Sequence, residues 1–140
     1  MHELVFVFRQ GGDKSINNIQ LGRFGRNRTN VWNYPGATSF ARKGGKRNLD
    51  IHPTTKPIAL VADALLDSTQ RDDIVFDPYL GSGTTVLAAH RTARRCYGIE
   101  IDPLYVDTAI LRWQKMSGKE AHHSSGATFA EIMADRTSAS

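Results

Sequence analysis

The sequence predicts an α/β fold in which helices flank a mostly parallel sheet, and three features of residues 74–102 predict it. The apolar run at residues 74–76 has the length and composition of a buried strand in a parallel sheet. A glycine turn follows, and residues 84–92 then predict a helix with apolar side chains available to pack on the sheet. A second run at residues 96–99 predicts another strand, which completes a βαβ unit.

An acidic residue, Glu100, stands at the carboxyl end of the second predicted strand, 17 residues after Gly83. This is close to the spacing at which an acid reaches a ribose hydroxyl pair in nucleotide-binding βαβ units. We expect Gly81 and Gly83 to let the backbone approach the ligand closely, because a Cβ there would block it. The unit therefore predicts a site for an adenosine-containing ligand.

Two further elements are predicted before this unit. The apolar and β-branched run at residues 3–8 predicts a strand. Residues 58–66 predict a helix, because Pro57 suits the first helical position and the apolar residues recur on one face.

The chain after the βαβ unit predicts one long helix and a polar tail. Asp102 is the expected N-cap, with Pro103 at the first helical position and Gly118 as the C-cap. Residues 119–140 are polar and small, with one short helical stretch near residues 128–136.

The composition indicates one soluble, globular domain. The 140 residues are 40% apolar and 23% charged. No apolar run approaches the length of a membrane span, and no charged-then-apolar leader opens the chain, so we expect neither membrane insertion nor secretion. The single cysteine, Cys96, falls within a predicted strand and excludes an internal disulfide. A cytoplasmic location is expected.

The charge is distributed unevenly along the chain. Residues 1–60 hold ten Lys or Arg against three acids, whereas residues 61–140 hold eight against eleven. A basic first half joined to a mildly acidic second half indicates a polyanionic partner that meets one face of the protein.

The basic residues gather in glycine-rich stretches of residues 10–50 that read as exposed loops. Arginine and lysine neutralise phosphates, and arginine also reaches base edges. The alternative is an ordinary solvated loop in which Trp32 and Tyr34 cover one edge of the core. The predicted DNA-binding residues are Arg23, Arg26, Arg28, Arg42, Lys43, Lys46 and Arg47.

The residues of the glycine turn indicate which class of adenosine-containing ligand the unit binds. A dinucleotide fingerprint, G-x-G-x-x-G, would have a third glycine where this chain has Val86. The sequence instead reads D-P-Y-L-G-S-G-T-T from Asp77 and G-I-E-I-D-P from Gly98. These two motifs resemble the S-adenosylmethionine site of amino-group DNA methyltransferases, which modify adenine N6 or cytosine N4.

The resemblance implies a partial Rossmann-like methyltransferase fold with S-adenosylmethionine as cofactor. Its cofactor contacts would come from Asp77, Pro78, Tyr79, Gly81, Ser82, Gly83, Thr84, Glu100, Ile101 and Asp102. A second element, H-P-T-T-K-P, would cover the methionine end of the ligand, where the start of a helix suits a carboxylate. This element contributes His52, Pro53, Thr54 and Lys56.

The family's catalytic motif, [DNS]-P-P-[YFW], does not occur in this sequence, because none of its five prolines is adjacent to another. One subclass of the family orders its parts as catalytic motif, target recognition and cofactor site. By that order, residues 1–50 would end the target-recognition segment and include one strand, residues 51–118 would form the cofactor-binding portion, and residues 119–140 would be a tail. No catalytic residue or metal site is assigned.

Three functions therefore remain open. The first is part of a site-specific DNA methyltransferase that acts on double-stranded DNA, completed by a partner chain or a lost amino-terminal segment that carries the catalytic half. The second is a remnant or subunit that binds S-adenosylmethionine or DNA but transfers nothing. The third is a nucleotide-dependent oxidoreductase, which the missing third glycine disfavours.

Overall fold

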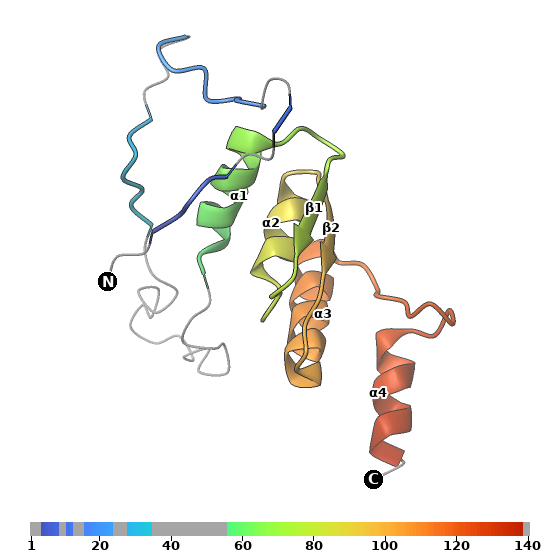
Figure 1. Ribbon diagram of the computed structural model, residues 1–140. Helices are drawn as coiled ribbons and strands as arrows, with labels where there is room; N and C mark the ends of the chain where they lie inside the picture. The colour runs from blue at the N-terminus through green and yellow to red at the C-terminus, as the bar shows by residue number, and fades with distance from the viewer. Residues whose placement is uncertain (1–3, 9–10, 13–15, 24–27, 35–55, 139–140) are drawn as a thin grey trace.

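The computed structural model describes residues 4–8, 11–12, 16–23, 28–34 and 56–138. Within these residues the chain forms four helices and two strands (Figure 1). In chain order they are α1 (Ile58–Ser68), β1 (Ile74–Asp77), α2 (Thr84–Arg91), β2 (Arg95–Gly98), α3 (Pro103–Ser117) and α4 (Phe129–Ser138). No described helix is both long and apolar enough to cross a membrane.

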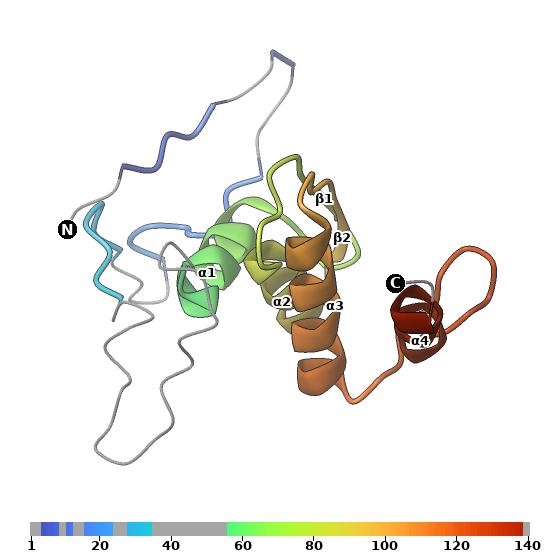
Figure 2. The same cartoon turned by 90° about the horizontal axis from the view of Figure 1, so that it is seen from below.

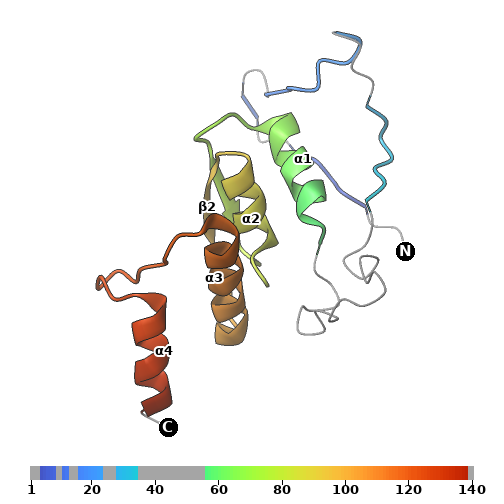
Figure 3. The same cartoon turned by 180° about the vertical axis from the view of Figure 1, so that it is seen from behind.

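The two strands and the helix between them form the predicted βαβ unit. Strands β1 and β2 are parallel neighbours, with Val75 opposite Cys96 and Phe76 opposite Tyr97. Helices α2 and α3 lie on the same side of the strands, and α1 lies beyond α2 (Figures 1 and 3). The predicted α/β class is confirmed, and each strand begins and ends within one residue of its predicted bounds.

Helix α2 is the centre of the packed core. It contacts α1, β2 and α3, and its Leu87, Ala88 and Ala89 are almost completely buried. The alanines have little side-chain volume, so neighbouring elements can approach the α2 backbone closely. Ala109 of α3 is buried against this layer.

The other face of the sheet is largely exposed. Ile74, Phe76, Tyr97 and Ile99 are each 57–59% exposed. Phe76 and Tyr97 are cross-strand partners, and alternate side chains along a strand share one face. Among the described residues, helices therefore cover only one face of the sheet.

The strand predicted at residues 3–8 is not found in residues 4–8, so that prediction is wrong for the described part. These five apolar side chains are 63–89% exposed. A strand requires a hydrogen-bonded neighbour, and the described sheet contains only β1 and β2.

Local signals set the helix ends. The Asp102 side chain accepts a hydrogen bond from the Leu104 N–H at 2.9 Å, and Gly118 closes α3 with φ 67°. Pro57 is the N-cap of α1 and not its first helical residue, so the prediction was wrong by one position.

The predicted polar tail contains α4. This helix starts with a capping box in which Thr128 and Glu131 bond each other's backbone N–H groups at 2.7 and 3.2 Å. Helix α4 stands apart from the βαβ unit (Figure 2), and the ion pair between Arg136 and Asp107 connects it to α3 at 3.0 Å.

Candidate functional site

The carboxyl ends of the two parallel strands lie side by side, and the Glu100 carboxylate joins the loops that follow them. One oxygen, Oε2, accepts a hydrogen bond from the Gly81 N–H at 2.6 Å, and the other, Oε1, accepts one from the Asp102 N–H at 2.9 Å. The ends of strands in a parallel sheet are where such folds bind ligands. Glu100 therefore stands at the expected place for a binding residue.

These hydrogen bonds also fix the ionisation of Glu100. The Asp102 N–H, followed by the Gly81 N–H, lowers the pKa of the Glu100 carboxyl below its ordinary value. A carboxylate offers about four acceptor positions, and these two bonds use one on each oxygen. Glu100 therefore keeps a negative charge and acceptor capacity for hydroxyl groups.

Asp77 fixes the turn between β1 and α2. Its Oδ1 accepts a hydrogen bond from the Tyr79 N–H at 3.0 Å, and its Oδ2 accepts one from the Thr85 hydroxyl at 2.6 Å. The Leu80 N–H donates to the Ile99 carbonyl at 2.9 Å, which ties the same turn to the end of β2. The turn is thus held to both strands and to α2.

The two glycines of the turn have different surroundings. A Cβ on Gly83 would lie 2.6 Å from the Ala109 Cβ, so the missing side chain at Gly83 lets α3 approach the turn. A Cβ on Gly81 would meet no atom within 4 Å. Both residues have positive φ, 52° at Gly81 and 81° at Gly83. We predicted that both glycines make room for a ligand, but the structure gives Gly83 a packing role and leaves open space only at Gly81.

This difference predicts separate effects for Gly83→Ala and Gly81→Ala. Gly83→Ala should destabilise the fold by about 2–4 kcal/mol, because overpacking adds to the strain of positive φ. Gly81→Ala carries the strain alone, roughly 1–2 kcal/mol, and should mainly weaken ligand binding. Thermal melts of the two variants would check this. Equal melting temperatures would contradict the packing role of Gly83.

The loop after β1 and the residues that follow Glu100 expose large apolar side chains. Tyr79 is 89% exposed, Ile101 96% and Leu104 72%. Such side chains can flank a planar aromatic ring, which would cover apolar area that is now in water.

The predicted site residues Ser82 and Thr84 face inward, and each is 8% exposed. The Ser82 hydroxyl lies 2.7 Å from Arg112 Nη1, which also donates to the Ser82 carbonyl. Burial lowers the pKa of the Arg112 guanidinium. Sequence reasoning missed Arg112, although it lies three residues after Ala109 on the same face of α3.

The second predicted cofactor element is only partly described. Lys56 precedes α1 and is exposed, whereas His52, Pro53 and Thr54 lie outside the described residues. In the described part of the chain, no group of three or more His, Cys, Asp or Glu is placed to hold a metal ion.

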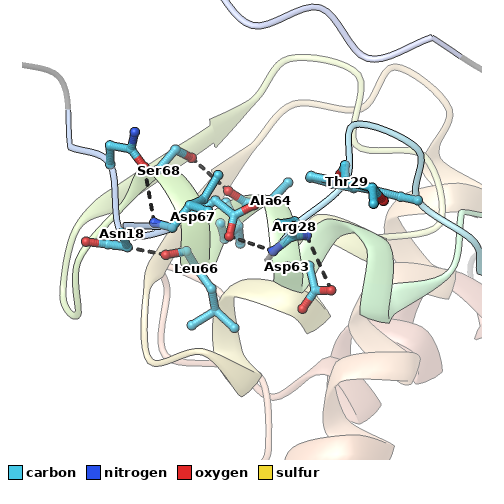
Figure 4. Close-up of polar contacts among 12 residues, drawn as sticks. Asn18, Arg28, Thr29, Asp63, Ala64, Leu66, Asp67 and Ser68 are labelled. Atoms are coloured by element: carbon cyan, nitrogen blue, oxygen red, sulfur yellow. Dashed lines mark hydrogen bonds and ion pairs between the residues drawn. The ribbon is translucent and has the colours of Figure 1, made fainter. Parts of the chain in front are cut away.

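Of the predicted DNA-binding residues, only Arg23 and Arg28 are described; Arg26, Arg42, Lys43, Lys46 and Arg47 lie outside the described residues. Arg28 faces α1, where Nη1 lies 2.6 Å from Asp67 Oδ1 and Nη2 lies 3.5 Å from Asp63 Oδ2 (Figure 4). Its guanidinium carbon lies 4.1 Å from the centre of the Trp32 ring.

Tyr34 belongs to the same cluster. Its hydroxyl bonds Asp63, and burial followed by this bond raises the pKa of Tyr34 to about 12. The half-buried side chains of Trp32 and Tyr34 thus lie beside the ion pairs on α1.

A protein-family model described as DNA methylase matches residues 1–111. The type II methyltransferase M.ScaI of Streptomyces caespitosus is 34% identical over 99 residues, which cover 71% of this chain and 32% of the relative. The type II methyltransferase M2.MboI of Moraxella bovis is 34% identical over 87 residues, 62% of this chain and 30% of the relative. The chain thus spans about a third of the length of these curated relatives.

Solved structures also show similarity. The complex of M1.HpyAVI with SAM has a TM-score of 0.42 and 43% sequence identity, over 43% of this chain and 31% of that one. The PvuII DNA methyltransferase, described as cytosine-N4-specific, has a TM-score of 0.45 and 26% identity, over 55% of this chain and 33% of that one.

Proposed function

The chain belongs to the amino-group DNA methylase family, and from this premise we propose that it is the cofactor-binding and DNA-contacting part of a site-specific DNA methyltransferase. The observation that carries the proposal is the placement of the Glu100 carboxylate at the ends of the parallel strands, where it accepts hydrogen bonds from the Gly81 and Asp102 N–H groups. The cofactor is S-adenosylmethionine, which supplies a methyl group for an exocyclic amine of adenine or cytosine.

The described residues fit this cofactor. Glu100 would accept hydrogen bonds from the two ribose hydroxyls, for which its acceptor capacity suffices. Open space at Gly81 lets the ligand approach the turn, and the exposed side chains of Tyr79 and Ile101 would flank the adenine ring. The start of α1, after Lys56 and Pro57, would bind the methionine carboxylate through free backbone N–H groups.

The groups that hold the target amine would come from elsewhere, because the sequence has no [DNS]-P-P-[YFW] motif. We propose that a second chain or a further segment of the same protein supplies them. A double-stranded DNA substrate and a chain with one cysteine fit a cytoplasmic protein. A binding remnant remains the alternative function.

Calorimetric titration with S-adenosylmethionine, its demethylated product, NADH and ATP tests the cofactor assignment. We expect the first two ligands to bind with comparable affinity, because both carry the adenosine and methionine groups. NADH and ATP should bind much more weakly. Preferential binding of NADH would support the oxidoreductase alternative instead.

The interaction with DNA is tested by its salt dependence. Changing Arg42, Lys43, Lys46 and Arg47 to glutamine should flatten the slope of log affinity against log salt by up to about 0.9 for each phosphate that is no longer neutralised. A matched control changes four basic residues of the acidic half to glutamine: Arg71, Arg91, Arg95 and Lys119. If both variants changed the slope equally, the basic residues of the first half would have no special role.

A further inference from the structure

Asn18 fastens the chain before Arg23 to the end of α1 (Figure 4). Its Nδ2 donates to the carbonyls of Leu66 and Thr69, both at 2.8 Å, and its backbone N–H donates to the Asp67 carbonyl at 3.0 Å. The last carbonyls of a helix have no partner within the helix. Asn18 therefore stabilises the end of α1 while it fixes its own segment there.

Arg28 fastens the chain after Arg23 to the same end of α1. Its guanidinium reaches Asp67 at 2.6 Å and Asp63 at 3.5 Å, and it stacks on Trp32. The Arg28 side chain is 25% exposed and that of Asp67 is 16% exposed. The buried Asp67 Oδ2 has no hydrogen-bond partner, so Arg28 is the main described partner of this carboxylate. Removing one member of such a pair leaves a poorly compensated charge.

These interactions make Arg28 a poor phosphate ligand. Two carboxylates, Asp63 and Asp67, share the one guanidinium, so their combined formal charge repels a polyanion. Arg23 lies between the two anchoring residues in the sequence. A residue that holds its segment in place affects DNA binding through the position of its neighbours, whereas a residue that touches DNA neutralises a phosphate directly.

We propose that Arg28 is a positioning residue that, together with Asn18, anchors a DNA-contacting segment to α1, and we define this segment by the described residues 16–23 and 28–34, which include Arg23. Because α1 packs on α2 of the βαβ unit, this anchor fixes the DNA-contacting segment relative to the cofactor site. The inference rests on the proposed function, and it removes Arg28 from the set of residues that touch DNA directly.

The variant Asp67→Asn distinguishes a positioning role of Arg28 from a direct contact with phosphate, because the two roles predict opposite changes in DNA affinity. The measurement uses the full 140-residue chain and duplex DNA. It removes a negative charge and weakens the hold on Arg28. If Arg28 positions the segment, DNA affinity should fall by about three- to tenfold, as expected when a partly buried charged hydrogen bond is removed, with an unchanged salt slope. If Arg28 touched phosphate, releasing it would raise the affinity and steepen the slope. Higher or equal affinity would overturn the proposal.

Asp107→Asn is the matched control. This variant also removes a carboxylate from an ion pair, the one with Arg136, and it changes the net charge by the same amount as Asp67→Asn. The pair, however, connects α3 and α4 and does not involve α1. We expect its DNA affinity to equal or exceed that of the parent chain. If Asp107→Asn weakened binding as much as Asp67→Asn, the effect would be general and the proposal would be overturned.

Arg28→Lys provides a second variant that keeps the charge. Lysine cannot form the planar fork that reaches two carboxylates, so positioning predicts weaker DNA binding, whereas a direct interaction with phosphate predicts nearly unchanged binding. S-adenosylmethionine affinity serves as the folding control for Asp67→Asn and Arg28→Lys. It should equal that of the parent chain, whereas partial unfolding would lower it. A parent chain that does not bind DNA would refute the proposed function and this inference together. A parent chain that binds DNA, with Asp67→Asn tighter, would refute the inference alone.

Discussion

Glu100→Ala should weaken S-adenosylmethionine binding by on the order of tenfold or more, the loss expected when hydrogen bonds to a charged acceptor are removed. The variant removes the proposed acceptor of both ribose hydroxyls. It also removes the acceptor of the Gly81 and Asp102 N–H groups, so the turn keeps only its backbone hydrogen bond from Leu80 to Ile99 as a described connection to the residues after β2. Titration calorimetry measures the change in affinity. A variant that bound as tightly as the parent chain would refute the ribose assignment.

Glu120→Ala is the matched control, because Glu120 is an exposed acid between α3 and α4 and the charge change is identical. Its affinity for the cofactor should equal that of the parent chain.

The pH dependence gives a second check on Glu100. Since the pKa of the Glu100 carboxyl is lowered, the group stays ionised as pH falls from 7 to 5, and its contribution is lost only when pH falls through the lowered pKa. Cofactor affinity should therefore be the same at both pH values.

The sequence predicted the βαβ unit and the ends of α3 because their signals are local. Short apolar runs, the glycine turn and the Asp102 and Gly118 caps act within a few residues of one another. The position of Glu100 after β2 follows from the same pattern.

The interactions that the sequence did not predict depend on distant parts of the chain. Gly83 was expected to let a ligand approach, but α3 places Ala109 where the Cβ of any larger residue would be. The environment of Arg28 is set by carboxylates 35 and 39 residues later, which no local pattern indicates. The strand expected at residues 3–8 would need a neighbouring strand, and such pairing is a property of the whole sheet.

The isolated chain should self-associate or melt at a low temperature. Adding a chain that carries the catalytic motif should reduce the self-association and raise the melting temperature. The uncovered face of the sheet exposes Ile74, Phe76, Tyr97 and Ile99 by more than half. In the described sheet, β1 pairs only with β2, so its other edge also presents backbone groups for pairing. The chain spans about a third of the length of its curated relatives, so we expect a part that carries the catalytic motif to supply elements that cover these surfaces.

The magnitudes favour a large effect. Full burial of an apolar side chain of this size contributes roughly 1.5–3 kcal/mol, and covering the exposed half of one contributes about half as much, whereas the whole stability of a domain is about 5–15 kcal/mol. Four such side chains are therefore comparable to the margin that separates a stable domain from a marginal one. Light scattering and thermal melts, with and without a fragment that carries the catalytic motif, would measure association and stability.

Ile74→Thr combined with Phe76→Ser tests whether the uncovered face is responsible. These side chains meet water in the isolated chain, so the variant should associate less but should gain less stability from the added fragment. Leu111→Ser is the control, because Leu111 is 51% exposed on α3, away from the sheet face. A parent chain that stayed a monodisperse monomer and melted cooperatively above about 60 °C, within the range of intact domains, would show that the sheet needs no second part.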